Sequence, residues 1–549
     1  MASAGTSMLR CVPGVAACAL MLVGCAIPAG SRAGTLGKSQ GWAHFGNSLA
    51  NTRYSGLRQL TADNVTHLRI VWTRSEGLAP QLWEDYPVVV GRTMYITTST
   101  DEVEAVDAIT GRVRWSYIPR VDFFVAGAGA LPLATNRGVA VSKGRVYLTT
   151  FDDRLVALSA ASGRQLWQTT IASPTLGYTE TAGPTVYDGL VYVGNSSTGT
   201  GVRGFLAAFD AATGTRRWLF YTVPPPGQGW VPRRGHHGGG DAWMPPTIDP
   251  STGMVYAATG NPTPDLVRSI RPGCDPHADS IVALTARTGR LVWSRSLVCA
   301  DAWDYDTSQA PFYFTLRLGG RAVRVVADGS KSGRLIVLDA LTGHVVSESP
   351  YLTPYTAPHL TPTTRGVRVC PGAFGGLEYS PPSYDPVTGS VYLDGVRACM
   401  RYTSESAAAA ARHRRGHPDV GGSYTLLRTP RPIGYLAAVD PATGRTRWED
   451  RLPLPSVGGT LATAGGLVFT GDDNGRLYAA AARSGRILWS IDLRLPMGSA
   501  PFTYAVAGRQ YLAVVAGGSQ LAVVSGLQTG GRLVVFDLAG DHAPRRRVG

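Results

Sequence analysis

Residues 105–115 read AVDAITGRVRW: an apolar run, a short polar turn and a second run that ends in tryptophan. The alternating apolar run is typical of a β-strand. The aspartate side chain accepts backbone amides in a tight turn, and the glycine tolerates the positive φ that such a turn needs. A flat indole at a fixed place is well suited to pack against a neighbouring unit. The stretch therefore predicts a β-hairpin that docks through its tryptophan.

The same phrase recurs along the chain, with a weaker version, VVFDLAGD, at 534–541. Another apolar strand pair with its own turn precedes each copy, so each unit contains about four strands. Four-stranded units repeated in this way are typical of β-propellers, whose closed ring leaves no long sheet edge exposed. The other copies are ALSAASGRQLW (157–167), AFDAATGTRRW (208–218), ALTARTGRLVW (283–293), VLDALTGHVVS (337–347), AVDPATGRTRW (438–448) and AAAARSGRILW (479–489).

We predict an all-β fold: an eight-bladed β-propeller of four-stranded blades with tryptophan-docking repeats, spanning residues 41–541 as a single domain. An open solenoid or an array of β-sandwiches is the alternative. The copies are widely spaced from Trp218 to Trp293 and from Ser347 to Trp448, which predicts insertions in the middle blades. The second insertion contains a polar, basic segment at 404–424, which we expect to be a mobile surface loop and which says little about chemistry.

Composition supports a packed globular protein, with 44% hydrophobic and 16% charged residues. The formal charge of +14 comes mostly from scattered arginines. Because no nucleic-acid-binding motif accompanies that charge, we expect no nucleic-acid partner. A basic protein outside the cytoplasm, near anionic lipid or cell wall, is the simpler interpretation.

The N-terminus predicts a targeting segment. An apolar stretch from Val12 to Val23 is too short to span a bilayer but has the length of a signal-peptide core. It ends in Leu-Val-Gly-Cys25, which resembles the lipobox of bacterial lipoproteins and implies lipidation of Cys25. We therefore expect a lipoprotein signal peptide at 1–24, a tether at 25–40, and an extracytoplasmic, membrane-anchored protein at the cell surface or in the periplasm. An ordinary secretory signal is the alternative. Residues 542–549 form a basic tail.

Four cysteines remain after the signal peptide and Cys25, and in a secreted chain they indicate two disulfides. Short separations favour Cys274–Cys299 and Cys370–Cys399, although the sequence allows other pairings. No CxxCH motif occurs, which excludes a covalently attached c-type haem.

From Trp42 to Gly518 the chain resembles the quinoprotein alcohol dehydrogenases, which bind pyrroloquinoline quinone (PQQ) at the centre of an eight-bladed propeller. The motifs that carry this resemblance are WAHFGNSLANTRYSGLRQLTADNVTHLRIVW (42–72), NRGVAV (136–141), GVRGFLAAFD (201–210), GNP (260–262), RPG (271–273), DAWDYD (301–306) and SKSGRLIVLD (330–339). As a set they are specific, whereas each alone is weak.

The resemblance implies a PQQ site. Trp243 matches the indole platform under the quinone, Arg137 a cation for a PQQ carboxylate, and Thr181 a hydroxyl donor. Lys331 matches the catalytic cation beside the reactive carbonyl. Each has a plainer interpretation: Trp243 as a packing residue, Arg137 as a structural cation, and Thr181 and Lys331 as turn residues.

The resemblance also implies a metal, calcium or a lanthanide. Asn261 and Asp304 match ligands of the metal, and Asp304 also matches the proposed general base. Asp306 matches the extra carboxylate of the lanthanide-using branch, because a further charged oxygen ligand favours a trivalent ion. The alternative is a structural hairpin with one solvated acid.

Three departures weaken the resemblance. Gly199 stands where the family usually has a glutamate metal ligand. The adjacent-cysteine pair before NRG is missing from 129–138. The family's GG-x-Asn-Trp pattern ends here in Glu378 and Tyr379, and Glu378 adds a negative charge near a tricarboxylate unless it serves the metal.

The favoured function is a PQQ-dependent oxidoreductase that oxidises a small-molecule or polymeric alcohol to an aldehyde or ketone. Without a haem motif, its electrons would pass to an external acceptor. A non-catalytic propeller lipoprotein that acts as a binding or assembly scaffold is the main alternative. A hydrolase or carbohydrate-binding propeller is the third, although Asp304 and Asp306 lie too close in sequence to assume carboxylates opposed across a glycoside.

Overall fold

The computed structural model describes residues 40–77, 82–123, 135–197, 199–225, 238–519, 521–522 and 530–538. The chain divides into the units Met1–Leu36 and Gly37–Gly549, and all described residues belong to the second. The predicted signal peptide, Cys25, most of the tether and the basic tail lie outside the described residues. Among those residues, no helix is long and apolar enough to cross a membrane.

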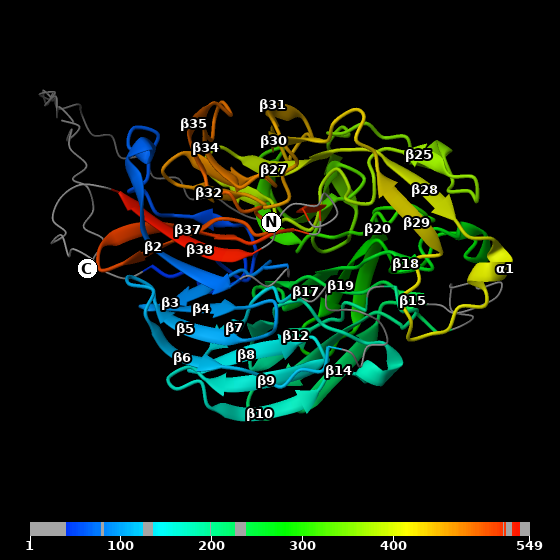
Figure 1. The fold of residues 1–549 in the computed structure, drawn as a ribbon, viewed down its shortest axis with the longest axis horizontal. Coiled ribbons are helices and arrows are strands. Elements are labelled where there is room, and N and C mark those ends of the chain that lie inside the picture. Colours follow the sequence, from blue (N-terminus) through cyan, green and yellow to red (C-terminus); the bar gives the residue numbers. More distant parts are fainter. Residues whose placement is uncertain are drawn as a thin grey trace, which may run out of the picture. The chain divides into compact units, whose positions relative to one another are not determined.

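Within the described residues, eight antiparallel four-stranded sheets follow one another and form the blades of the propeller (Figure 1). The prediction of an all-β, eight-bladed propeller is therefore confirmed. The first four blades are β3–β6 (Val88–Val90, Thr93–Thr97, Val103–Asp107, Val113–Tyr117), β7–β10 (Ala140–Ser142, Arg145–Thr150, Arg154–Ser159, Gln165–Thr170), β11–β14 (Thr185–Tyr187, Leu190–Val193, Phe205–Asp210, Arg216–Tyr221) and β16, β17, β19 and β20 (Thr247–Asp249, Met254–Ala258, Ser280–Thr285, Leu291–Ser296).

The other four blades complete the ring. The seventh carries an extra strand, β1 (Tyr54–Ser55), which pairs in parallel with β32. These blades are β21–β24 (Phe312–Leu318, Arg321–Ser330, Arg334–Asp339, Val345–Glu348), β26, β27, β30 and β31 (Ser383–Asp385, Ser390–Arg397, Ile433–Val439, Thr446–Leu452), β32–β35 (Leu461–Thr463, Leu467–Gly471, Arg476–Ala481, Ile487–Asp492), and β36–β38 with β2 (Phe502–Val506, Arg509–Ala516, Gly531–Leu538, Leu68–Gly77).

The ring closes in the eighth blade, where the two ends of the propeller chain meet. Strand β2, from the start of the chain, pairs antiparallel with β38, from its end, and Leu68 lies opposite Leu538. Figure 1 shows this pairing as a blue strand beside red ones. Strand β2 thereby covers the edge of β38, which would otherwise be a template for aggregation.

Repeat tryptophans dock on the turn glycine of the next repeat, as predicted, whereas Trp489 packs edge-on against Phe536. A side chain on Gly289 would collide with the Trp218 ring, and the Trp218 indole N–H donates to the carbonyl of Ala286. Trp72 of β2 docks in the same way on Gly111 of the first blade. The phrase that ends in Ser347 replaces the indole with a hydroxyl, which donates to the Pro441 carbonyl at 2.6 Å. The other tryptophan–glycine pairs are Trp115–Gly163, Trp167–Gly214, Trp293–Gly343 and Trp448–Gly485.

Hydrophobic clusters fill the spaces between neighbouring blades. Between the first two blades, for example, Val103 and Ala105 pack with Val146 and Leu148, and all four are fully buried. Blade-to-blade packing of this kind holds the ring together and leaves the connecting loops free to build a site.

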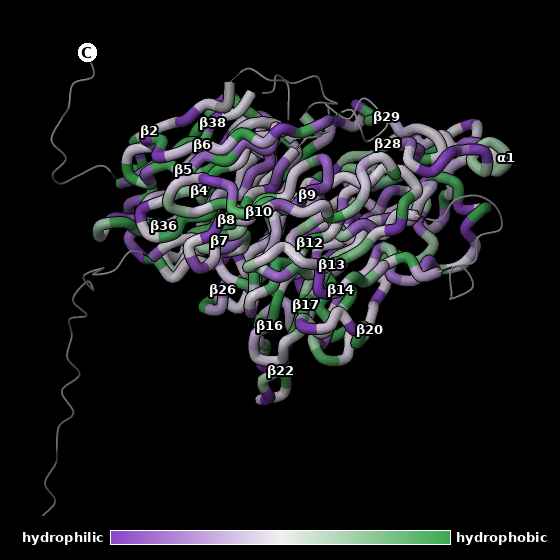
Figure 2. The backbone as a smooth tube through the Cα atoms, turned by 90° about the horizontal axis from the view of Figure 1, so that it is seen from below, coloured by the Kyte–Doolittle hydropathy of each residue, from purple (hydrophilic) through white to green (hydrophobic). Residues whose placement is uncertain are grey.

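The insertions lie in the middle blades, as predicted. Strand β18 (Pro262–Thr263) pairs with β15 (Gly238–Gly239), and the 3₁₀ turn η4 (Arg268–Ile270) follows before β19. The longer insertion contains β28 (Met400–Ser404), α1 (Ala407–Ala410) and β29 (Gly422–Leu426), and β28 also pairs with β25 (Val367–Val369). In Figures 1 and 2, β28, β29 and α1 lie together, far from β2 and β38. The remaining 3₁₀ turns are η1 (Val65–His67), η3 (Pro174–Leu176) and η5 (Ala357–His359).

The four cysteines form the disulfides Cys274–Cys299 and Cys370–Cys399, the pairing that short separations favour. All four lie in or beside loops that connect blade strands, near the segments described next.

Candidate active site

One cavity of about 190 Å³ collects loops from several blades. All seven residues that the resemblance assigns to PQQ or metal line it: Arg137, Thr181, Trp243, Asn261, Asp304, Asp306 and Lys331. The lining also includes Leu82, Glu84, Thr135, Ser196, Gly199, Gly239, Asp241, Gly260, Thr263, Asp265, Glu378, Tyr379, Val420 and Tyr424.

A lysine surrounded by three carboxylates forms one wall. The Lys331 ammonium lies 2.8 Å from Asp306 Oδ2, 3.4 Å from Asp304 Oδ1 and 3.6 Å from Glu378 Oε1. Burial lowers the pKa of Lys331, but attraction to the three carboxylates outweighs it and raises that pKa above its usual value. Burial raises the pKa of Asp304, against the attraction of Lys331. The carboxylates exceed the single ammonium in charge, so this wall favours a further cation.

The two predicted metal-binding stretches touch each other through Asp306. The backbone N–H of Asn261 donates to Asp306 Oδ1 at 2.6 Å. A side chain on Gly260 would lie 2.7 Å from the same oxygen, so this approach requires glycine. Asp301 fixes the neighbouring turn, since its carboxylate accepts from the backbone N–H groups of Trp303 and Tyr305. This turn brings Asp304 and Asp306 to Lys331.

A second part of the cavity lining is built around Arg137. Its guanidinium pairs with Glu84 at 2.6 Å and donates to the Thr181 hydroxyl at 2.6 Å. It lies 5.0 Å from the centre of the Trp243 ring and 5.1 Å from that of Tyr379. Burial raises the pKa of Glu84, against the attraction of Arg137. Among the described residues Arg137 Nε is buried without a hydrogen-bond partner, which leaves a donor for an anionic ligand.

The acids Glu84, Asp241 and Asp265 line the cavity but were not predicted as site residues. Burial raises the pKa of Asp241 to about 7, although its carboxylate accepts from the Asn195 amide and the backbone N–H of Ser197. Asp265 is buried, and in the described part of the chain nothing hydrogen-bonds its Oδ1. Its place four residues after Asn261, in GNPTPD, was the available signal.

The structure shows the surroundings of Gly199 and Glu378, two positions at which the sequence departs from the family pattern. Gly199 has φ of +69°, and a side chain there would approach the Asp419 carbonyl at 3.3 Å. The long insertion therefore lies where a glutamate would need room. Glu378 faces Lys331 and contributes to the same carboxylate cluster. Most of the segment that lacks the cysteine pair, residues 129–134, lies outside the described residues.

The segment 404–424, expected to be a mobile surface loop, also contributes to the lining of the cavity. The segment contains α1 and the start of β29, and its residues Val420 and Tyr424 line the cavity. Its backbone is fastened to the neighbouring loop: the N–H groups of Asp419 and Gly416 donate to the carbonyls of Gly199 and Thr200.

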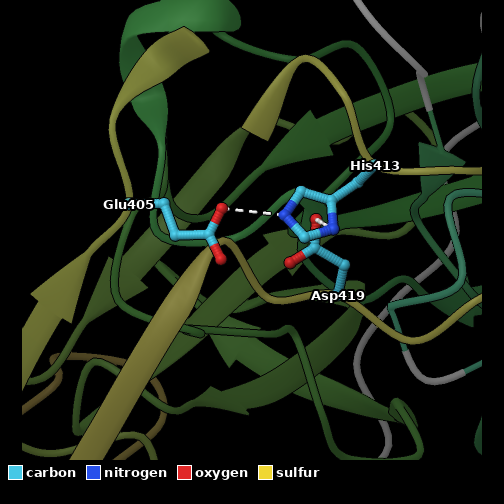
Figure 3. Close-up of side chains that lie close together, drawn as sticks. All are labelled: Glu405, His413 and Asp419. Carbon is cyan, nitrogen blue, oxygen red and sulfur yellow. Dashed lines mark hydrogen bonds and ion pairs between the residues drawn. The ribbon is translucent and has the colours of Figure 1, made fainter. Parts of the chain in front are cut away.

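A histidine joins two acids within this segment (Figure 3). His413 Nε2 lies 2.7 Å from Glu405 Oε2, and His413 Nδ1 lies 3.2 Å from Asp419 Oδ2. We call these three residues the clasp. They also offer ligand atoms within 4.8 Å of one another, as a metal site would. Each ring nitrogen of His413 lies close to one carboxylate oxygen, so the imidazole links the two acids.

Comparison with known proteins places this geometry in a family. Residues 42–351, more than half of the chain, match the family model described as glucose/ethanol/alcohol dehydrogenase, beta-propeller domain. The chain belongs to the PQQ-dependent alcohol dehydrogenase family.

Other members of this family resemble the chain over most of its length. A quinohemoprotein alcohol dehydrogenase from Comamonas testosteroni is 32% identical over 87% of this chain and 72% of its own length. The structure of the quinohemoprotein alcohol dehydrogenase ADHIIG from Pseudomonas putida superposes with a TM-score of 0.83 at 30% identity, covering 93% of this chain and 82% of the other. A europium-containing methanol dehydrogenase gives 0.82 at 27% identity, covering 91% and 98%.

A second family model, described as outer membrane protein assembly factor BamB, matches residues 433–538 of this chain, in its C-terminal blades.

Proposed function

We propose that this protein is an extracytoplasmic, PQQ-dependent oxidoreductase that oxidises an alcohol to an aldehyde or ketone and passes the electrons to an external carrier. The observation that carries the proposal is the cavity itself, which is lined by both the lysine–carboxylate cluster and the Arg137–Trp243 pair. Family membership supports the reaction class, and the two disulfides support an oxidising compartment. We further propose that lipid on Cys25 anchors the chain to a membrane.

The residues present fit PQQ. Trp243 offers an aromatic face, while Arg137 and Thr181 offer donors for its carboxylates, and the unpartnered Arg137 Nε is consistent with a missing anion. The ammonium group of Lys331 would itself be the cation beside the quinone carbonyl. When bound, PQQ supplies the oxidant that accepts the electron pair from the alcohol.

The residues also fit a hard cation such as calcium or a lanthanide. The side-chain oxygen of Asn261 and the carboxylates of Asp304 and Asp306 would hold it, and the unpartnered Asp265 oxygen adds a further acceptor nearby. The excess of carboxylates around Lys331 supports this assignment, whereas Gly199 removes one ligand. The preference of the site for calcium or a lanthanide therefore tests how far Asp306 compensates for the ligand that is lost at Gly199.

Asp304 is the proposed general base, which takes the proton of the alcohol hydroxyl. Its carboxylate lines the cavity, and Lys331 at 3.4 Å holds it in place and favours its charged form. Tyr424 and Val420, from the long insertion, would help to exclude water from this end of the cavity.

The test is a titration of the chain from Ala26 onward with PQQ, without metal, with calcium and with a light lanthanide. We expect metal-dependent quenching of tryptophan fluorescence and PQQ-dependent dye reduction with alcohols. Asp304→Asn should abolish turnover, whereas the exposed Asp63→Asn, with the same change of charge, should not. Turnover of Asp304→Asn equal to that of the wild type would contradict the assigned base.

A non-catalytic binding or assembly scaffold is the second candidate. Gly199, which provides no metal ligand, and the match of residues 433–538 to an assembly-factor family favour it. Absence of PQQ binding under all three conditions would replace the enzyme proposal with this one.

A further inference from the structure

A second, smaller hollow adjoins the cavity, and its lining includes basic side chains together with the acid Asp419. It shares Gly199 and Thr263 with the cavity, and Arg414, Arg415 and His417 of the long insertion also line it. We call these three residues the basic rim. Hydrophilic segments, coloured purple, lie beside α1 in Figure 2. The rim therefore stands where a ligand of the cavity would project outwards.

The charges of the rim are not neutralised within the insertion. Arg414 and Arg415 are exposed, and the described residues include no ion pair to either of them. The nearby acids Glu405 and Asp419 lie within ion-pair distance of His413, and among the described residues neither forms an ion pair with Arg414 or Arg415. An exposed guanidinium without a partner is a strong site for a carboxylate or phosphate, because its fork of donors matches their oxygens.

One part of the cavity lining is rich in carboxylates. Asp304, Asp306 and Glu378 surround Lys331. A ligand with one anionic end and one neutral end is therefore oriented by the field of the protein, with its anion at the rim and its neutral end inside.

We propose that the substrate is an alcohol that also carries an anionic group, a carboxylate or a phosphate, held by Arg414 and Arg415 while the hydroxyl reaches Asp304. This inference rests on the proposed function and gives it a substrate class. The anionic group takes no part in the oxidation and serves only to bind and orient the substrate. His413 is a positioning residue, because it ties Glu405 and Asp419 on either side of the rim.

The test compares kcat/KM for ω-hydroxycarboxylates and ω-hydroxyalkyl phosphates with kcat/KM for n-alkanols of matched length. The double variant Arg414→Gln/Arg415→Gln should lower the anionic-to-neutral ratio by about tenfold or more, the usual size of a lost charged hydrogen bond. Arg317→Gln/Arg321→Gln is the matched control, since it removes the same charge from exposed residues of the β21–β22 hairpin. This control should keep the wild-type ratio.

Two further measurements sharpen the result. Raising the ionic strength should lower the ratio in the wild type more than in the rim variant, because salt screens exposed charges. His413→Gln should lower the ratio partially and speed tryptic cleavage after Arg414 and Arg415, as expected when the clasp opens.

An unchanged ratio in the rim variant, or an equal fall in the control, overturns the inference. So does a rim variant that keeps its substrate preference but reduces an acidic protein acceptor more slowly, because the rim would then serve an electron carrier. If no variant oxidises any alcohol, the proposed function fails. Calorimetric binding of an ω-hydroxycarboxylate to wild type and rim variant then decides the inference separately.

Discussion

At the scale of single residues, buried acids connect the blades to the site. Asp101 is fully buried, and its carboxylate accepts from the Asn136 amide at 2.8 Å and from the Phe151 N–H at 2.7 Å. Asn136 directly precedes Arg137, so Asp101 helps to place a residue of the cavity. Burial raises the pKa of Asp101 from 3.8 to about 7.

Asp101→Asn should flatten the dependence of stability on pH. In the wild type, the folded chain holds a proton on Asp101 that the unfolded chain has already lost, between pH 3.8 and about 7. The contribution of Asp101 to the free energy of unfolding is therefore greatest below this window. It falls as pH rises through the window, by up to about 1.4 kcal/mol per pH unit. Asparagine cannot titrate, and it tolerates the φ of +65° at this position.

Chemical unfolding at a series of pH values measures this slope. Asp63→Asn, at an exposed position, should leave the slope unchanged. A wild-type slope in Asp101→Asn would show that other groups set the dependence.

At the scale of the repeat element, the tryptophan–glycine contact is the unit of blade docking. Trp218 is 9% exposed, and its ring packs on Gly289 and lies 5.9 Å from the Tyr192 ring. We expect Trp218→Ala to lower the free energy of unfolding by about 3–5 kcal/mol, the usual cost of truncating a buried aromatic side chain.

A double-mutant cycle with Gly289→Ala tests whether docking is the cause. An alanine at 289 would collide with the Trp218 ring, so its cost should shrink once that ring is removed. Gly253→Ala is the matched control, because Gly253 has the same positive φ, with nothing within 4 Å of an added side chain. Equal costs of Gly289→Ala in both backgrounds would contradict direct docking.

The sequence revealed the elements whose signals are local. The turn glycine and the closing tryptophan lie within a few residues of each other, so the repeat could be recognised from the sequence alone. The place of the insertion beside the cavity could not be predicted, because β29 exists only through its pairing with β28, and the run Ala407–Ala411 gave no sign of that partner. Glu84 and Asp265 were missed because their burial comes from loops distant in sequence. Each looks like an ordinary loop acid when read alone.

At the scale of the whole molecule, the ring and the loops of the cavity are stabilised by different means. Strand pairing and tryptophan docking hold the blades, whereas the disulfides fasten loops. Cys274–Cys299 joins the loop that follows Asn261 and Asp265 to the segment that precedes Asp304.

Cys274→Ser/Cys299→Ser should therefore loosen the site and spare the ring. We expect faster amide hydrogen exchange in residues 259–279 and 297–311, with protection of the blade strands and the far-ultraviolet circular dichroism retained. PQQ and metal affinity should fall together. Loss of protection throughout the blades would instead mean that the disulfide supports the entire propeller.

The closure of the ring by β2 and β38 also has a kinetic consequence. The first long strand of the propeller pairs with the last, so the eighth blade cannot form until Gly531–Leu538 has been synthesised. Contacts between such distant segments form slowly, because the intervening chain must first be brought together. Until then β2 and β37 present unpaired edges to other chains. A nascent chain interrupted before Gly531 would thus be an open, self-associating intermediate, and its last eight-residue strand completes the fold.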